Sequence, residues 1–294
     1  MSAFESDNPV LSSIEPVPYT GFRSLRKTLE KQRARFSQEL ATNSPPLSQF
    51  IQFCGVSEAE FQKLSDDERY LKSYRLNYYR HSESLIVRIA IIQVFNIWSL
   101  IYVTYQSDRL LERNERPLCL GISAENFGPM EKQPDAAFVR RTPPGYFRRT
   151  VIFEVGIMDP TAWLERSART WIEAPGSPDR IVLMIDVNKP ALKINFHVFK
   201  RDPSRQPSIV DDRQVHYAFN EQTLVVDCAN DFRISGVRYD PHTRATEEIN
   251  SLLLDFHYLM GRNPVPPTER DVVFESSTLK EVAEDWYQEK ERFT

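Results

Sequence analysis

The sequence predicts an α/β fold with an α-rich N-terminal region. Residues 22–105 hold long stretches with helical character, whereas residues 118–239 hold a series of short apolar runs typical of strands. Asp159 followed by Pro160 is a helix-start signal between two of these runs. Helices followed by strand, strand, strand, helix and strand indicate an α/β protein rather than an all-α one.

The composition is that of a globular protein from a reducing compartment. The chain has 294 residues, of which 41% are hydrophobic and 27% are charged. Its formal net charge of −4 argues against indiscriminate coating of nucleic acid or anionic membrane, but it leaves room for a locally basic site. The three cysteines are far apart and lack metal-ligand spacing. No secretory signal is evident, so we expect a cytoplasmic or nuclear location.

The N-terminal region is expected to be mostly helical. Residues 1–21 are rich in proline and small polar residues and are expected to be disordered. Residues 22–79 are expected to form a helical region, with one exposed helix at 22–40 and another at 57–79.

The apolar segment at residues 85–103 has about the length of a bilayer-crossing helix. At 100° per residue, however, Arg88, Asn96 and Ser99 fall on one narrow face. A polar stripe on an apolar helix predicts a core helix at about 82–105 with one face at a cleft, and no membrane partner.

The remaining elements are predicted from apolar runs and turn signals. The sequence "TPPG" predicts a turn that joins two strands into a hairpin. The helix at 160–174 should pack through Trp163 and Trp171, which lie on one face, and Gly176 should end it. A helix is expected at about 245–260, and another in the polar C-terminal tail. The expected strands are 118–123, 135–141, 150–157, 180–187, 191–199, 215–219, 223–228 and 233–239.

Two carboxylates occupy neighbouring strands of the predicted hairpin. Asp135 begins one strand, and Glu154 lies in the middle of the almost wholly apolar next one. A buried charge is unfavourable unless it is paired or binds a metal ion. Mg²⁺ takes oxygen ligands and needs only one or two protein carboxylates. The alternatives are a turn role for Asp135 and a structural ion pair between Glu154 and a nearby arginine.

The segments "QPDAAF", "RRTVIFEVGIMDPTAWLERSARTWI" and "DRIVLMIDV" resemble the PD-(D/E)XK restriction-endonuclease-like superfamily. They are similar in particular to a group of fungal hypothetical proteins with a "PD…EVG" pattern. The resemblance covers about residues 80–190 and implies a restriction-endonuclease-like mixed β-sheet flanked by helices. We therefore expect a core domain at 80–262, followed by a linker and a helix at 263–294.

The resemblance also implies a metal site and an activity. Asp135 matches the motif aspartate and Glu154 the motif glutamate, which together would hold Mg²⁺ or Mn²⁺ for cleavage of DNA or RNA. The sequence departs from the motif at Gly156, where the superfamily has a lysine. Members that lack this lysine often use a basic residue of the next helix, here Arg166 or Arg169.

Three other residues are weaker candidates for the same site. Lys132 is a further cation that could replace the motif lysine. An acidic residue of the first helix completes many such sites, and Glu83 is the candidate for it here. His81 is a lone histidine, for which a structural role is favoured over catalysis.

The tip of the predicted hairpin is basic and aromatic. Arginines interleaved with Tyr146 and Phe147 suit phosphate contact and base stacking, although a solvated loop is an equally weighted alternative. The arginines in question are Arg140, Arg141, Arg148 and Arg149.

The sequence thus leaves three functions open. The leading hypothesis is a Mg²⁺-dependent nuclease-like protein. The second is a degenerate member of the same fold that binds nucleic acid or protein without cutting it, which Gly156 favours. The third is an accessory or regulatory protein of a fungal pathway.

Overall fold

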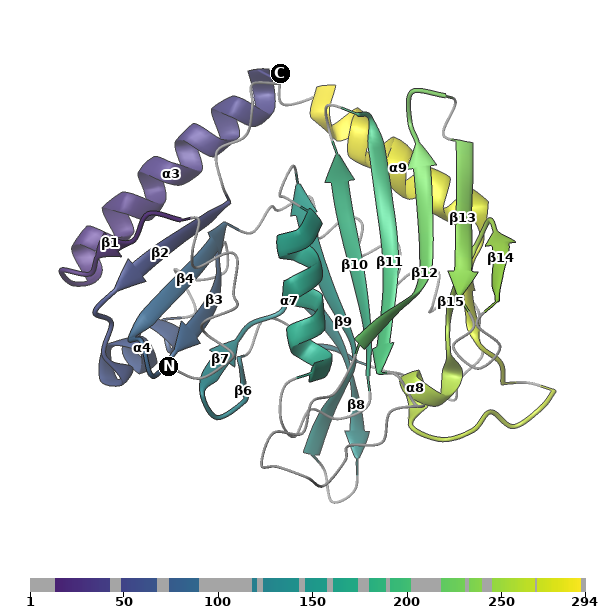
Figure 1. The fold of residues 1–294 in the computed structure, drawn as a ribbon, viewed down its shortest axis with the longest axis horizontal. Coiled ribbons are helices and arrows are strands. Elements are labelled where there is room, and N and C mark those ends of the chain that lie inside the picture. The colour runs from purple at the N-terminus through teal and green to yellow at the C-terminus, as the bar shows by residue number, and fades with distance from the viewer. Residues whose placement is uncertain are drawn as a thin grey trace. The chain divides into compact units, whose positions relative to one another are not determined.

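The computed structural model divides the chain into two compact units. The first comprises Met1–Ile92, Ile122–Pro134 and Phe293–Thr294, and the second comprises Gln93–Gly121 and Asp135–Arg292. Each unit contains its own multistranded sheet, so the chain is a mixed α/β protein as predicted (Figure 1). The structure describes residues 14–42, 49–67, 74–89, 118–120, 124–142, 146–157, 161–173, 180–188, 191–201, 218–230, 233–239, 245–267 and 269–291.

The first unit contains a six-stranded sheet in the order β1-β2-β4-β3-β7-β6. Only β1 and β2 are parallel; the other neighbours are antiparallel. Helices α3 (Phe22–Thr42) and α4 (Glu58–Ser65) contribute to its core, with Leu25 and Leu29 of α3 almost fully buried. The strands are β1 (Val17–Pro18), β2 (Phe50–Cys54), β3 (Tyr74–Tyr79), β4 (Ser84–Ile89), β6 (Glu125–Asn126) and β7 (Met130–Lys132).

The strands of this unit correct the expectation that it is mostly helical. The helix predicted at 22–40 is confirmed as α3. Of the described part of the helix predicted at 57–79, residues 58–65 are helical and residues 74–79 form strand β3. The start of the expected core helix is strand β4 instead. Its hydrophobic periodicity is two, because Leu85 and Val87 join the core cluster whereas Ile86 does not. Residues 1–13 and 90–105 lie outside the described residues.

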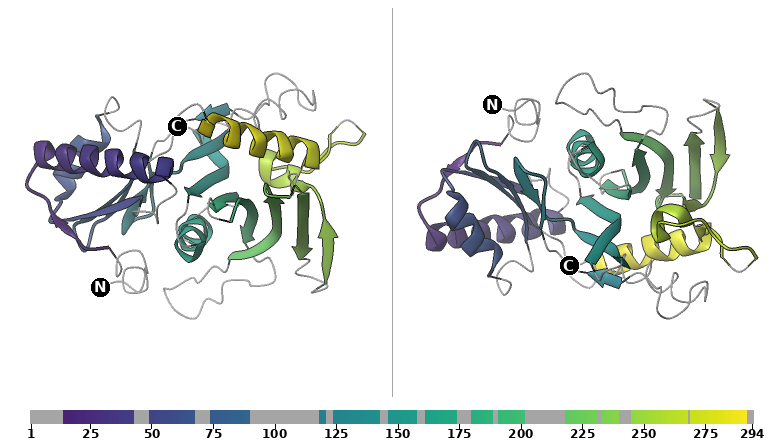
Figure 2. Two further views of the ribbon diagram at one scale, coloured as in Figure 1. Left: turned by 90° about the horizontal axis from the view of Figure 1, so that it is seen from above. Right: turned by 90° about the horizontal axis from the view of Figure 1, so that it is seen from below.

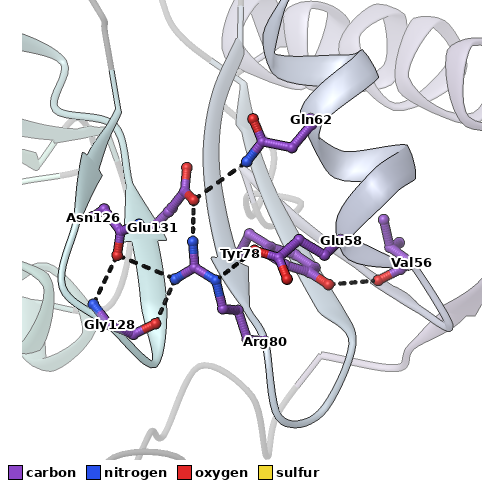
Figure 3. A network of polar contacts seen from close by, with 8 residues as sticks. All are labelled: Val56, Glu58, Gln62, Tyr78, Arg80, Asn126, Gly128 and Glu131. Atoms are coloured by element: carbon purple, nitrogen blue, oxygen red, sulfur yellow. Dashed lines mark hydrogen bonds and ion pairs between the residues drawn. The ribbon is translucent and has the colours of Figure 1, made fainter.

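Arg80, in the turn between β3 and β4, ties several parts of the first unit together (Figure 3). Its Nε donates to Glu58 Oε1 at 2.9 Å, and its Nη2 forms an ion pair with Glu131 on β7. Its Nη1 donates to the carbonyl of Gly128 and to the side chain of Asn126, both in the β6–β7 hairpin. One guanidinium therefore links α4, the β3–β4 turn and the β6–β7 hairpin.

The second unit contains an eight-stranded sheet in the order β14-β13-β12-β11-β10-β9-β8-β5. All neighbours are antiparallel except β9 and β10, which are parallel and are joined through helix α7 (Thr161–Glu173). The strands are β5 (Leu118–Leu120), β8 (Ala136–Thr142), β9 (Tyr146–Ile157), β10 (Ile181–Asn188), β11 (Lys193–Arg201), β12 (Ala218–Asp227), β13 (Arg233–Tyr239) and β14 (Thr246–Ile249).

The central part of this unit agrees with the sequence prediction. The strands predicted at 135–141, 150–157 and 180–187 are β8, β9 and β10, adjacent in one sheet. Trp171 of α7 is fully buried, as predicted, while Trp163 is half-buried. Figure 2 shows α7 on one face of the sheet and α9 (Ser276–Glu291), the predicted tail helix, on the other. Asp159, Pro160, Gly176 and most of the "TPPG" turn lie outside the described residues.

The helix expected at 245–260 is wrong for most of its length. These residues form β14, the short strand β15 (Leu252–Leu254) and a five-residue helix α8 (Phe256–Met260). Strand β15 pairs with β16 (Val272–Phe274), so tertiary pairing overrides the local helical tendency. Helix α8 begins at the cap Asp255 and ends at Gly261, whose φ of 62° favours glycine. None of the helices that the structure describes is long and apolar enough to cross a membrane.

Candidate functional site on the second sheet

The structure brings Asp135 and Glu154 to neighbouring positions. Ala136 of β8 is paired with Phe153 of β9, and the Asp135 amide donates to the Phe153 carbonyl at 3.2 Å. Asp135 directly precedes β8, and this bond holds it against β9 beside Phe153, the residue before Glu154. Both are buried, with exposed fractions of 6% and 1%. The predicted strand position thus holds for Glu154 on β9, whereas Asp135 is a bend residue that directly precedes β8.

The Asp135 carboxylate turns toward the backbone of β9. Its Oδ2 accepts a hydrogen bond of 2.7 Å from the amide of Val155, the residue after Glu154. A charge-assisted hydrogen bond of this length holds the carboxylate in a fixed orientation. The Asp135 side chain is therefore positioned by the strand that carries Glu154.

The Glu154 carboxylate is hydrogen-bonded by helix α7. Ser167 Oγ donates to Oε2 at 3.1 Å, and the indole Nε1–H of Trp171 donates to Oε1. The two donors are four residues apart and so lie on one face of the helix, which the sequence predicted. The sequence interpretation took Trp171 as core only and missed its role as a donor. The sequence signal for these contacts was the i, i+4 spacing of a hydroxyl and an indole on the helix that follows an apolar strand with one carboxylate.

Arg180 extends this buried polar cluster. It immediately precedes β10, is 1% exposed, and its Cζ lies 5.8 Å from the centroid of the Trp171 ring. The sequence interpretation did not single out this residue. The buried guanidinium therefore packs over the indole whose N–H donates to Glu154.

Asp186 is a third buried carboxylate that sequence reasoning missed. It lies on β10 directly opposite Gly156, the position where the superfamily that the sequence resembles has a lysine. Its Oδ2 accepts hydrogen bonds from Thr161 Oγ1 at 3.1 Å and Asn195 Nδ2 at 3.2 Å. Burial raises the pKa of the Asp186 carboxyl, and the two hydrogen bonds partly oppose this shift.

The cations expected from α7 point in different directions. At 100° per residue, Arg169 falls on the helix face opposite Ser167 and Trp171, and its Nη1 lies 3.7 Å from Glu173 Oε1. Arg166 falls between these two faces and is half-buried. Helical geometry therefore places Arg169 away from Glu154 and leaves Arg166 as the nearer of the two.

Glu83, His81 and Lys132 belong to the first unit, whereas Asp135 belongs to the second. Glu83 was expected on a helix, but it is an exposed turn residue before β4 with φ 46°. His81 is exposed in the same turn, and Lys132 is buried on β7.

The hairpin arginines are divided between the two faces of the sheet. Arg140 and Arg148 are directly opposed, whereas Arg149, the next residue of β9, pairs with Val139 and lies on the other face. The Arg140 guanidinium packs so closely on Gly261 that a Cβ there would lie 2.6 Å from Nη2. For Arg141, the structure gives only its backbone pairing with Phe147, whose own side chain is 52% exposed.

The site holds few potential metal ligands. Among the described residues, no group of three or more His, Cys, Asp or Glu side chains has a geometry suited to a metal ion. The carboxylates of Asp135 and Glu154 are the oxygen donors of the predicted site, and Mg²⁺ commonly takes one or two protein carboxylates together with waters.

No protein-family model matches the chain, and no curated protein gives a significant match to it.

Proposed function

We propose that the protein is a metal-dependent, nuclease-like hydrolase of the PD-(D/E)XK type that acts on phosphodiester bonds in nucleic acid. The observation that carries this proposal is that Asp135, directly before β8, is hydrogen-bonded to the backbone of β9 on either side of Glu154, in a unit where β9 and β10 are parallel and joined through α7. The order of these elements is the one that the sequence resemblance implies.

The donor set of this site fits a hard divalent cation. Asp135 and Glu154 offer carboxylate oxygens, the ligand type that Mg²⁺ and Mn²⁺ prefer. A carboxylate oxygen has two lone pairs, so an oxygen that accepts one hydrogen bond can also bind a metal ion. When bound, Mg²⁺ would lower the pKa of a coordinated water and offset the charge of the phosphate.

The chain's own residues would hold the two carboxylates in place. The Val155 amide fixes Asp135, while Ser167 and Trp171 fix Glu154. Such positioning avoids reorganisation when a ligand binds. Arg166 is the α7 cation best placed to contact a phosphate, and as an arginine it would stabilise charge rather than remove a proton.

The test combines metal binding with cleavage. The purified protein is titrated with Mg²⁺ and Mn²⁺ by calorimetry, then incubated with single- and double-stranded DNA and RNA in either metal. We expect Asp135→Asn and Glu154→Gln to abolish metal binding and to reduce cleavage at least 100-fold, because each removes a charged ligand. Glu248→Gln, at an exposed position of β14, is the matched control and should retain both properties.

The alternative function is binding without cleavage, and Gly156 is the observation that favours it. No side chain at this position can orient an attacking water as the motif lysine does. Salt-sensitive nucleic-acid binding without cleavage by the unmutated protein would establish this alternative. Cleavage that persists in Glu154→Gln would show a contaminating nuclease and overturn the hydrolase proposal.

A further inference from the structure

Helix α3 concentrates positive charge in an otherwise acidic protein. Its 21 residues include six basic and two acidic side chains, a net charge of +4, whereas the whole chain has −4 and the remainder therefore −8. The basic residues are Arg23, Arg26, Lys27, Lys31, Arg33 and Arg35. A charge asymmetry of this size creates a local positive potential that the net charge conceals.

The basic side chains form a ridge on the solvent side of the helix. Leu25, Leu29 and Phe36 are buried and mark the face that packs into the core of the first unit. At 100° per residue, Lys27 lies roughly 180° from the centre of that buried face, with Arg23 and Lys31 about 40° to either side of it. All three basic residues are exposed. Successive members of the ridge are four residues apart, about 6 Å along the helix axis.

Helix stability does not explain this ridge. Like charges at i, i+4 destabilise a helix by about 0.2–0.5 kcal/mol per pair, and Arg23, Lys27 and Lys31 form two such pairs. Glu30 lies outside the arc of these residues, and its carboxylate is 2.9 Å from Arg26 Nε on the flank of the ridge. Exposed Arg35 continues the ridge toward the C-terminal end of the helix.

We propose that the α3 ridge of Arg23, Lys27, Lys31 and Arg35 binds the phosphate backbone of nucleic acid. A row of exposed cations without intervening carboxylates complements a row of phosphates and carries no base specificity. An anionic membrane fits the ridge less well, because interfacial helices insert an apolar face and the apolar face of α3 is buried in its own core. Phe22, the first residue of α3, is a large apolar side chain that is exposed, and one such residue at the helix end does not form an apolar face.

This inference does not depend on the proposed hydrolysis, because the ridge belongs to the first unit and Asp135 and Glu154 to the second. Binding is therefore measured in excess EDTA, so that cleavage cannot occur. Fluorescence anisotropy with labelled duplex DNA and single-stranded RNA over a series of salt concentrations gives the affinity and its salt dependence.

The informative variant combines Arg23→Gln, Lys27→Gln and Lys31→Gln. If all three residues contact phosphates, the slope of log K against log salt for duplex DNA should become shallower by about 2.7, since each contact contributes about 0.9. The affinity at low salt should also fall at least tenfold. The matched control combines Lys63→Gln, Arg233→Gln and Arg270→Gln, exposed residues from scattered elements. It makes the same charge change and should keep the original slope.

The other outcomes would overturn the proposal. Equal slope changes in both triple variants would show a general effect of net charge. Unaltered binding in the ridge variant would place the phosphate contacts elsewhere. Binding to vesicles rich in phosphatidylserine, with none to nucleic acid, would assign the ridge to a membrane surface. Circular dichroism of both variants checks that α3 remains helical.

Discussion

At the scale of single residues, His197 shows how burial changes protonation. The side chain lies on β11, is 9% exposed, and its Nδ1 is 3.2 Å from Thr223 Oγ1. Desolvation lowers the pKa of His197 from 6.5 to about 4. The imidazole is therefore neutral in the folded protein at a pH where it would be protonated in the unfolded chain.

The folded protein should lose stability as the pH falls from about 6.5 to about 4. Over this interval the unfolded chain binds a proton at His197 that the folded protein does not, which favours unfolding by up to about 3 kcal/mol. Urea unfolding across this pH range should show a smaller pH dependence in His197→Gln. The control His81→Gln changes an exposed turn histidine and should behave as the unmutated protein. Identical curves for all three proteins would contradict the assignment.

At the scale of elements, the hairpin and βαβ unit were predictable because their signals are local. The apolar run at 180–187 and the Trp163–Trp171 spacing identify strand and helix without knowledge of the rest of the chain. The contacts of Glu154 were not predictable in the same way. They depend on which turn of α7 lies over β9, and this is set by packing rather than by sequence spacing alone.

The hydrogen bond between Trp171 and Glu154 should couple α7 to β9 energetically. Trp171→Phe keeps an aromatic ring but removes the indole N–H, so the buried carboxylate loses a donor at a cost of about 1–3 kcal/mol. In a Glu154→Leu background the same substitution should cost much less, because no carboxylate remains to be satisfied. Chemical denaturation of the two single variants and the double variant measures this coupling. Strict additivity would show that Trp171 acts through packing alone.

At the scale of the whole molecule, the second unit was predicted far better than the first. Its central strands β9 and β10 contain nearly continuous apolar runs bounded by turn signals, which identify them as buried strands. In the first unit, β3 and β4 are buried almost throughout, and β4 lies in a segment that also satisfies a helical stripe through Arg88. Only pairing with β2 and β7 decides between the two patterns, and these partners are distant in sequence.

Two units with separate sheets should also respond separately to a substitution within one of them. Arg80→Ala removes the links from the β3–β4 turn to Glu58 and Glu131 in the first unit. The Arg80 side chain is 19% exposed and that of Glu131 is 11% exposed, so the pair is only partly screened by solvent. We expect a loss of about 2–3 kcal/mol, because a poorly hydrated carboxylate is left without its cation.

Hydrogen exchange read by mass spectrometry should locate this loss. Amides of β3, β4 and β7 should exchange faster in Arg80→Ala, whereas those of β9 to β12 should keep their protection, since local stability follows the cooperative unit. The matched control, Arg238→Ala, breaks a more exposed pair whose Glu247 side chain is 61% exposed, and it should cost no more than about 1 kcal/mol. If Arg80→Ala instead weakened protection equally in both sheets, the two units would unfold as one. The loss of a single guanidinium in the first unit would then destabilise β8 and β9, the strands next to Asp135 and Glu154.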